Sequence, residues 1–195
     1  MENKSTMHLG GSGNNERIPL DLYETPEFFI KELLKYEQFD NNILEPCCGN
    51  GRISKTLIDN NYNVRSCDIV KRSYECEERD FLDNFNPIES SIYDIVTNPP
   101  YSLMNKFIYQ ATLIAKNKFA FVGRIQLLES TSRYNLIYKE GCNGFRLKKI
   151  LVSTKRLQFI TEDAKFRNGS PMCSCWFIFE RNYSGDAIIK WVNFD

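Results

Sequence analysis

Apolar positions along this chain come in short blocks, and the blocks alternate between extended and helical spacing. Short apolar runs bounded by polar residues are typical of buried strands, while apolar residues three and four positions apart are typical of helices. Extended blocks fall at residues 42–44, 62–67, 93–97, 119–122, 149–152 and 175–179, with a further strand expected to end at Asp80 and Phe81. Helical blocks fall at residues 26–36, 53–59, 103–115 and 129–138. Strands alternating with helices predict a doubly wound, Rossmann-like α/β sheet.

Composition indicates one globular domain preceded by a short arm. Of the 195 residues, 42% are hydrophobic and 26% are charged, which is ordinary for a globular protein. Residues 1–20 are rich in Gly, Ser and Asn without an apolar period, so we expect a flexible arm there and a single domain over residues 21–195. No apolar run approaches the roughly 18 residues of a membrane span, and the N-terminus lacks the apolar core of a signal peptide. We therefore expect a cytoplasmic protein with no membrane partner.

Two residue types exclude whole classes of chemistry. The only histidine, His8, lies in the expected arm, so we expect no histidine triad, metal site or proton shuttle. Seven cysteines are present, but Cys47-Cys48 and Cys173-Ser174-Cys175 lack the paired C-x2-C spacing of a zinc site. We expect no metal cofactor.

Acidic residues and glycines follow the ends of three expected strands. The first strand runs into Glu45-Pro46-Cys47-Cys48-Gly49-Asn50-Gly51, whose glycines let a ligand approach the backbone. Glu45 would repel a pyrophosphate but attracts a cation, and the loop lacks the third glycine of dinucleotide sites. Asp68 ends the next strand, where an acid can bind ribose hydroxyls, and Asp80 with Phe81 can bind and stack on an adenine. Together these features favour S-adenosylmethionine as the ligand.

A second motif, Asn98-Pro99-Pro100-Tyr101, follows the expected strand 93–97. The two prolines force the chain out of the sheet and bring no N–H groups, so their carbonyl oxygens remain as acceptors. The Asn98 side-chain oxygen and the Pro99 carbonyl can together accept both hydrogens of a planar exocyclic amine. The Tyr101 ring offers a surface on which a flipped base can stack. The motif therefore predicts methylation of an amine nitrogen.

These motifs, with Asp21-Leu22-Tyr23-Glu24-Thr25-Pro26 before them, resemble those of the class I S-adenosylmethionine-dependent methyltransferases. The resemblance is to the amino-methylating branch, in particular to short adenine-N6 DNA methyltransferases of phage and prophage type, over about residues 20–180. The segment 124–129 with Arg133-Tyr134 is similar to one that these short enzymes carry after the fifth strand. The resemblance implies a seven-stranded sheet whose last strand, 175–179, is antiparallel.

The same resemblance implies a role for each motif residue. The methionine end of the cofactor would be seated by Tyr23, Thr25 and Pro26. The rest of the cofactor would contact Glu45, Pro46, Gly49, Gly51, Asp68, Asp80 and Phe81. The target amine would be held by Asn98, Pro99, Pro100 and Tyr101, and an asparagine at the first of these positions is typical of adenine-N6 rather than cytosine-N4 enzymes.

Charge is balanced over the whole chain but divided along it. Residues 1–97 hold 10 Lys and Arg against 18 Asp and Glu, whereas residues 98–195 hold 15 against 7. This division is typical either of two solvated faces or of a basic face for a polyanion. On the second interpretation, the candidate nucleic-acid ligands are Arg124, Arg133, Arg146, Lys148, Lys155, Arg156, Lys165 and Arg167.

We therefore expect methylation of adenine N6 in DNA. The chain has no room for a separate target-recognition domain, so base reading would come from loops of the basic half, from a partner protein or from a homodimer. Three alternatives stay open: adenine methylation of RNA, methylation of a protein glutamine, and a methyltransferase-like module without turnover. The 2′-hydroxyl that separates RNA from DNA is read by contacts that the sequence does not reveal. Glutamine-methylating enzymes generally carry a helical substrate domain before the glycine loop, whereas only 44 residues precede Glu45 here.

Overall fold

The computed structural model describes residues 24–83, 85, 91–157 and 173–193 of the chain. The strands in this part are β1 (Asn42–Glu45), β2 (Asn63–Asp68), β3 (Glu77–Glu78), β4 (Asp94–Thr97), β5 (Lys118–Arg124), β6 (Phe145–Ser153), β7 (Ser174–Arg181) and β8 (Ile188–Val192). The α-helices are α1 (Glu27–Tyr36), α2 (Arg52–Asp59), α3 (Met104–Ile114) and α4 (Thr131–Tyr134). Shorter helical turns are η2 (Tyr101–Leu103), η3 (Ile125–Leu128) and η4 (Asn135–Lys139), the last of them π-helical.

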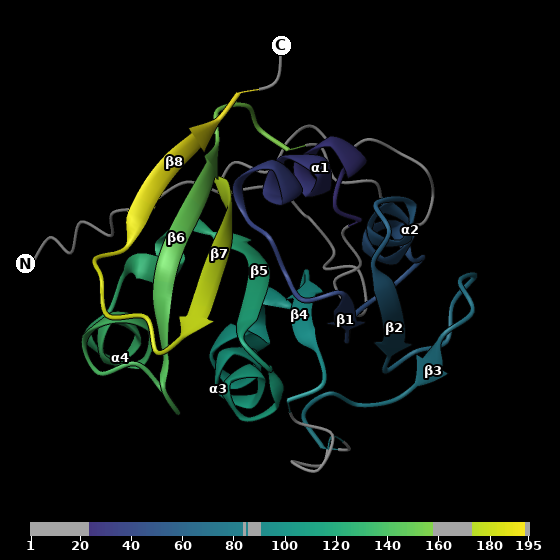
Figure 1. Cartoon of the computed structure of the whole chain (residues 1–195), viewed down its shortest axis with the longest axis horizontal. Coiled ribbons are helices and arrows are strands. Elements are labelled where there is room, and N and C mark those ends of the chain that lie inside the picture. Colours follow the sequence, from purple (N-terminus) through teal and green to yellow (C-terminus); the bar gives the residue numbers. More distant parts are fainter. Residues whose placement is uncertain (1–23, 84, 86–90, 158–172, 194–195) are drawn as a thin grey trace, which may run out of the picture.

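The eight strands form one sheet in the order β3-β2-β1-β4-β5-β7-β6-β8. Strands β1 to β5 pair with one another in parallel, β7 is antiparallel to both of its neighbours, and β6 pairs in parallel with β8. Helices α1 and α2 cover one face of the sheet, and α3 and α4 cover the other (Figure 1). The architecture is the expected doubly wound α/β fold.

The expected reversed strand is confirmed, but the expected number of seven strands is one too low. The stretch 175–179 lies inside the antiparallel strand β7. The additional strand is β8, which extends the sheet beyond β6. Its side chains Ile188, Ile189 and Trp191 are 47%, 47% and 66% exposed, so β8 lacks the apolar alternation that identifies a half-buried strand. Strand β3 contains only two exposed glutamates and ends before Asp80.

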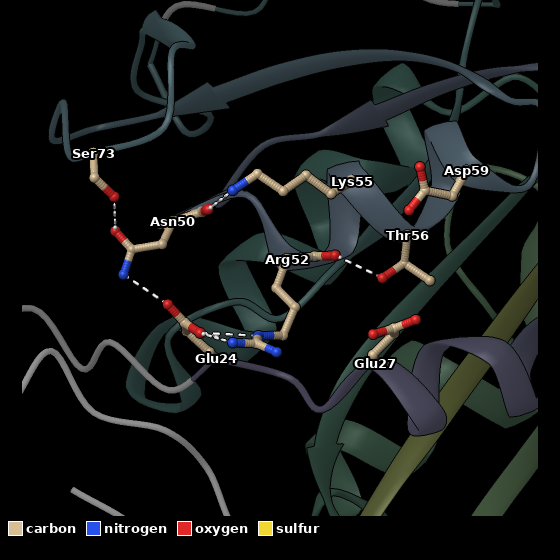
Figure 2. Close-up of a pocket in the computed structure, with 8 residues that line it drawn as sticks. All are labelled: Glu24, Glu27, Asn50, Arg52, Lys55, Thr56, Asp59 and Ser73. Carbon is tan, nitrogen blue, oxygen red and sulfur yellow. Dashed lines mark hydrogen bonds and ion pairs between the residues drawn. The ribbon is translucent and has the colours of Figure 1, made fainter. Parts of the chain in front are cut away.

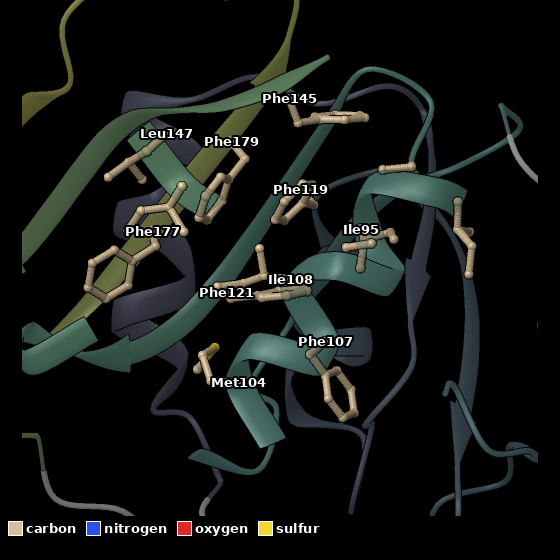
Figure 3. Packing of buried hydrophobic residues seen from close by; sticks show 14 of the residues in the cluster. Ile95, Met104, Phe107, Ile108, Phe119, Phe121, Phe145, Leu147, Phe177 and Phe179 are labelled. Carbon is tan, nitrogen blue, oxygen red and sulfur yellow. The ribbon is translucent and has the colours of Figure 1, made fainter. Parts of the chain in front are cut away.

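Alternating side chains on the central strands build two separate cores. On β5, Phe119 and Phe121 belong to the core on the α3 side, whereas Ala120 and Val122 belong to the core on the α1 side. The α3-side core is aromatic, and the rings of Phe119 and Phe179 stack with their centroids 4.4 Å apart (Figure 3). Because a strand buried on both faces must be apolar on both, this stretch of β5 forms a continuous apolar run.

Helix α1 begins one residue later than expected. Pro26, expected at the first helical position, is the N-cap residue, and its carbonyl accepts the Phe29 N–H at 3.0 Å. Thr25, directly before it, makes no capping hydrogen bond, and its hydroxyl is buried without a partner among the described residues. The indole of Trp176 in β7 instead anchors the first turn, because it donates to the Phe29 carbonyl at 2.8 Å and stacks on the Phe29 ring.

A buried carboxylate draws several lysines together at the edge of the sheet where the parallel strands begin. Glu37, directly after α1, accepts hydrogen bonds from Lys118, Lys148 and Lys149 at 2.6, 3.1 and 2.7 Å. Burial by itself would raise the pKa of Glu37, but the three lysine hydrogen bonds outweigh burial and lower that pKa to about 2. Lys148 also pairs with Glu180 at 2.6 Å. Part of the basic charge in the second half of the chain is therefore compensated at this edge.

Replacing Glu37 with glutamine is expected to lower the free energy of unfolding by about 3 kcal/mol at neutral pH, because three lysines lose a buried carboxylate. The pKa of this carboxyl is about 2 in the folded chain, against an ordinary value of 4.5. Its stabilising contribution is therefore complete above pH 4.5 and is lost as the pH falls towards 2. Urea unfolding at a series of pH values from about 3 to 7 measures the difference.

The matched control is Glu27→Gln, which removes the exposed partner of Lys31 on the same helix and is expected to change stability little. Equal losses in the two variants, or a Glu37→Gln loss that stays constant down to low pH, would contradict the role assigned to Glu37.

Candidate active site

Three neighbouring strands bring the two sequence motifs to one edge of the sheet. Strand β1 pairs in parallel with β2 on one side, Glu45 opposite Ser66, and with β4 on the other, Leu44 opposite Ile95. Since parallel neighbours end at the same edge, Asp68, Glu45 and Asn98 follow one another across it.

The glycine loop turns sharply between β1 and α2. Gly49 and Gly51 have positive φ angles of 55° and 77°, a conformation that favours glycine. The Gly51 N–H donates to the Cys48 carbonyl at 2.7 Å, and the Cys48 N–H donates to the Cys67 carbonyl at 3.0 Å. A Cβ atom at Gly51 would lie 2.3 Å from the ring of Tyr74, so the loop has no space for a side chain there.

Asp68 lies beside this loop at the end of β2. The Gly49 N–H donates to its Oδ2 at 2.8 Å, and the Val70 N–H donates to its Oδ1 at 3.0 Å. A carboxylate oxygen accepts more than one hydrogen bond, so these two contacts still allow hydroxyl donors to bind. Asp68 therefore both shapes the glycine loop and offers acceptors next to it.

Asp80 and Phe81 occupy different environments. Asp80 is half-buried after β3, and its Oδ1 accepts the Leu82 N–H at 2.8 Å. Phe81 is 2% exposed, and its ring stacks on Phe107 of α3 at a centroid distance of 5.2 Å, with Phe85 against its edge. Core rings thus cover the Phe81 ring, and its stacking on an adenine stays a prediction. Of this pair, Asp80 is the more accessible candidate ligand.

Glu45, the last residue of β1, is a buried carboxyl. The Ser54 hydroxyl in α2 donates to its Oε2, and Ser54 shares a further hydrogen bond of 2.6 Å with Ser66 in β2. Burial raises the pKa of Glu45 to about 8, while the hydrogen bonds from Ser54 oppose this shift and the nearby Asp68 charge adds to it. A cation placed against this carboxyl would favour its ionised form. Glu45 therefore fits a positively charged ligand at the glycine loop.

The tetrapeptide Asn98-Pro99-Pro100-Tyr101 leaves the sheet directly after β4. Pro99 is buried, whereas Asn98 and Tyr101 are half-buried. The Leu103 N–H donates to the Pro100 carbonyl at 2.9 Å and starts the turn η2, which leads into α3. The guanidinium of Arg124, the last residue of β5, lies 4.7 Å from the centroid of the Tyr101 ring. This cation–π contact holds the Tyr101 ring next to the end of β5.

A polar network that sequence reasoning missed ties the segment before α1 to the glycine loop. The Asn50 amide donates to Glu24 at 2.7 Å, and its oxygen accepts the Ser73 hydroxyl at 2.9 Å (Figure 2). Arg52 also donates to Glu24 at 2.9 Å. These four side chains line an open pocket together with Glu27, Lys55, Thr56 and Asp59. In the sequence, only their positions next to predicted site residues could have indicated a role, since Glu24 precedes Thr25 and Asn50 lies between the two glycines of the loop.

Several buried polar atoms near this edge have no hydrogen-bond partner among the described residues. They include the hydroxyl of Thr25, Nε of Arg124 and the side-chain oxygen of Gln126. Arg124 ends β5, while the Glu24 network brings Thr25 beside the glycine loop. An unsatisfied buried polar group costs about 1–3 kcal/mol, so each one needs an explanation. A polar ligand bound at this edge would supply the missing partners.

Besides Arg124, which contacts Tyr101, three of the predicted nucleic-acid ligands make contacts within the protein. Lys148 is paired with Glu37 and Glu180 at the opposite edge of the sheet. Arg133 donates to the Gln126 carbonyl at 2.9 Å, and Arg146 donates to the Tyr138 carbonyl at 2.7 Å. For Lys148 in particular, the carboxylates of Glu37 and Glu180 already compensate the positive charge that would otherwise attract a phosphate.

Lys155 and Arg156 are exposed directly after β6. Because β6 runs in the same direction as β4 and β5, its end lies at the edge of the sheet that carries the two motifs. These two residues are therefore the better placed candidates for phosphate contacts. The remaining predicted residues, Tyr23, Lys165 and Arg167, lie outside the described residues.

Within the described ranges, His, Cys, Asp and Glu side chains form no group of three or more that could hold a metal ion. The seven cysteines all fall in these ranges and are free thiols. No described helix has both the length and the apolar character that crossing a membrane requires.

Glu45→Gln is expected to change how stability depends on pH. The pKa of this carboxyl is about 8 in the folded chain, against an ordinary value of 4.5, so between these values the folded chain keeps a proton that the unfolded chain has lost. The stability of the unaltered protein therefore falls as the pH rises from about 5 to 8, and that of Glu45→Gln falls less. Urea unfolding across this range measures the two slopes.

Asp59→Asn, at an exposed position of α2, is the control and is expected to follow the unaltered protein. Parallel slopes for Glu45→Gln and the unaltered protein would mean that Glu45 is already ionised, and would contradict the assignment.

No protein-family model matches the sequence, and no curated protein matches it. Several solved structures do match. PH1948 from Pyrococcus horikoshii, a proposed RNA methyltransferase, has a TM-score of 0.60 and 14% identity over 83% of this chain and 87% of that one. Magnesium protoporphyrin IX methyltransferase (ChlM) from Synechocystis PCC 6803, solved with bound SAM, has a TM-score of 0.55 and 10% identity over 80% and 79%.

The methyltransferase subunit of a type I restriction-modification system from Streptococcus thermophilus also matches, with a TM-score of 0.55 and 10% identity. The match covers 88% of this chain and 47% of that one, so this chain spans about half the length of that subunit. At these identities the likeness establishes the fold alone. The chain has the fold of the class I methyltransferases.

Proposed function

We propose that the protein is an S-adenosylmethionine-dependent methyltransferase that transfers a methyl group to the exocyclic N6 amine of adenine in DNA. The observation that carries the proposal is the position of Asn98-Pro99-Pro100-Tyr101 at the end of β4, next to Glu45 and the glycine loop at the end of β1. One edge of the sheet thus combines a site suited to a cationic ligand with a site suited to a planar amine. The fold shared with the matched methyltransferases supports the same reading.

The residues at this edge fit S-adenosylmethionine. The unpartnered Thr25 hydroxyl suits its methionine end, the buried Glu45 suits its positive charge, and Asp68 suits its ribose hydroxyls. Asp80 is the candidate partner of its adenine. When bound, the cofactor supplies a methyl group on a positively charged sulfur.

Asn98 and Pro99 would hold the target amine. When their oxygens accept both amine hydrogens, the nitrogen keeps its electron density and a fixed direction, which favours attack on a methyl group. Tyr101, held by Arg124, gives the target base a ring on which to stack. The amine can lose its proton after transfer, so no general base is needed before attack.

Nucleic acid is supported as the substrate class by the exposed Lys155 and Arg156 at the motif edge and by two of the matched structures. We favour DNA because the motifs resemble those of adenine-N6 DNA methyltransferases. Adenine methylation of RNA is the alternative that the likeness to PH1948 favours, and one assay separates the two.

Transfer of label from the cofactor is expected to adenine N6 in DNA when duplex DNA, single-stranded DNA, RNA and a protein extract are offered in parallel. Mass spectrometry of the digested products identifies the methylated group. Label in RNA or in a protein glutamine would show that the proposed substrate is wrong, while methyl transfer to a nitrogen would stand. Cofactor binding without transfer to any acceptor would contradict the proposal and favour a module without turnover.

Two substitutions are expected to separate transfer from cofactor binding. Asn98→Ala should lower kcat by about 100-fold or more with little change in cofactor Kd, because it removes an acceptor of the amine. Asp68→Ala should weaken cofactor binding by about 10-fold or more, because it removes a charged acceptor and a support of the Gly49 turn. Calorimetry and initial rates measure the two effects, with Glu140→Ala, an exposed acid directly after η4, as the control. A large loss of cofactor affinity in Asn98→Ala would mean that its role is wrongly assigned.

Affinity for DNA is expected to fall as salt rises from about 50 to 200 mM, because phosphate contacts release counterions. Replacing both Lys155 and Arg156 with alanine should reduce the slope of log K against log salt by about 2. The matched control is Lys139→Ala, an exposed lysine at the end of η4, for which the slope should not change. An affinity that does not respond to salt would exclude the phosphate contacts.

A further inference from the structure

Gln126 follows β5 at the edge of the sheet that carries the proposed amine site, and its side chain has no part in the contacts assigned so far. It belongs to η3, which follows β5 at the edge of the sheet that carries Asn98. Strands β4 and β5 are neighbours with Thr97 opposite Phe121, and β5 continues past the end of β4 to Arg124 before η3 begins. Two positions before Gln126, Arg124 contacts the Tyr101 ring.

Three contacts hold the backbone around Gln126. Arg133 donates from its guanidinium to the Gln126 carbonyl at 2.9 Å. The Ile125 N–H donates to the Cys173 carbonyl at 3.0 Å, and Leu127 is buried in the core on the α3 side. The direction in which the Gln126 side chain leaves the backbone is therefore determined by the fold.

The side-chain oxygen of Gln126 is buried and has no hydrogen-bond partner among the described residues. Nε of Arg124 is also buried and likewise has no hydrogen-bond partner among the described residues. Proteins rarely leave a buried acceptor and a buried donor unsatisfied, since each costs about 1–3 kcal/mol. Because the two groups lie in one short segment next to Tyr101, a ligand with polar atoms in the amine site would satisfy them.

We propose that the Gln126 amide selects adenine by reading the edge of the target base beside its amine. The amide carries a donor and an acceptor, and rotation about its last bond exchanges them, so its N–H can take the buried unsatisfied position and donate to a ring nitrogen. In adenine that ring nitrogen is N7, while Asn98 and Pro99 keep both amine hydrogens. Cytosine also has an exocyclic amine but has no acceptor that corresponds to N7. The inference rests on the proposed function and adds that one side chain of this domain selects the base.

The test compares kcat/KM on an oligonucleotide that carries either adenine or 7-deazaadenine at the methylated position, in the sequence mapped by mass spectrometry. For the unaltered protein, kcat/KM is expected to be lower by about 10-fold or more on 7-deazaadenine than on adenine. On adenine, Gln126→Ala should have a kcat/KM lower than that of the unaltered protein by about the same factor. Replacing adenine with 7-deazaadenine should not lower the kcat/KM of Gln126→Ala further, because the contact is already absent. Gln126→Glu keeps the shape without the donor and should behave like Gln126→Ala.

Three controls accompany the comparison. Gln38→Ala, an exposed glutamine next to Glu37 at the opposite edge, should behave as the unaltered protein. Cofactor Kd and Tm should be unchanged in both Gln126 variants, which separates base reading from a folding defect. With 1-deazaadenine in the oligonucleotide, the loss of kcat/KM caused by the base change and the loss caused by Gln126→Ala should multiply, because the proposed contact does not involve N1.

The outcomes separate this inference from the proposed function. If the unaltered protein methylates adenine, but Gln126→Ala and 7-deazaadenine give multiplicative losses, the N7 contact is excluded and the proposed function stands. A Gln126→Glu variant as active as the unaltered protein would exclude it too. If the unaltered protein does not methylate adenine, the proposed function is overturned and this inference falls with it.

Discussion

Parallel pairing of β1 with β2 and β4 is the constraint on which the rest of the molecule depends. Backbone hydrogen bonds between these strands bring their carboxyl ends to one edge, and with them Asp68, Glu45 and Asn98. No direct contact among the three side chains is needed to explain why they gather. The glycine loop and the two prolines then turn the chain away from that edge, so that the backbone leaves space beside the strand ends.

The two edges of the sheet differ in how far their buried polar groups are paired. At the edge where the strands begin, Glu37 is surrounded by lysines, and buried Asp94 accepts the N–H groups of Asp40, Asn117 and Lys118. At the edge where the strands end, Glu45 is held largely protonated by burial, and hydroxyl and amide groups stay unsatisfied. Proteins depart from full polar satisfaction mainly at functional sites. The polar groups that stabilise the fold and those proposed to bind a ligand thus lie at opposite edges of the sheet.

The parts of the site that could be predicted were those that follow directly after an apolar strand. Burial on both faces leaves a continuous apolar run, so the ends of β1, β2 and β4 could be located together with Glu45, Asp68 and Asn98. The role of Phe81 was harder to predict, because an aromatic residue after a strand suits a ligand and a core equally, and the structure shows that its ring packs on Phe107.

Longer-range features left no sequence signal. The charge of Lys148 is compensated by Glu37 from the distant acidic half of the chain, a pairing that composition cannot reveal. Gln126 was inconspicuous because the burial of one amide oxygen depends on how η3 folds.

The outermost strand has a consequence for how copies of this chain meet in concentrated solution. A terminal strand presents backbone donors and acceptors along its outer side and can template the addition of another strand. Strand β8 adds the large apolar side chains Ile188, Ile189 and Trp191 to that surface. Lys190 lies between them, and antiparallel pairing of two copies about this residue would oppose like charges. Lys190 therefore opposes self-association along an edge whose other large exposed side chains are apolar.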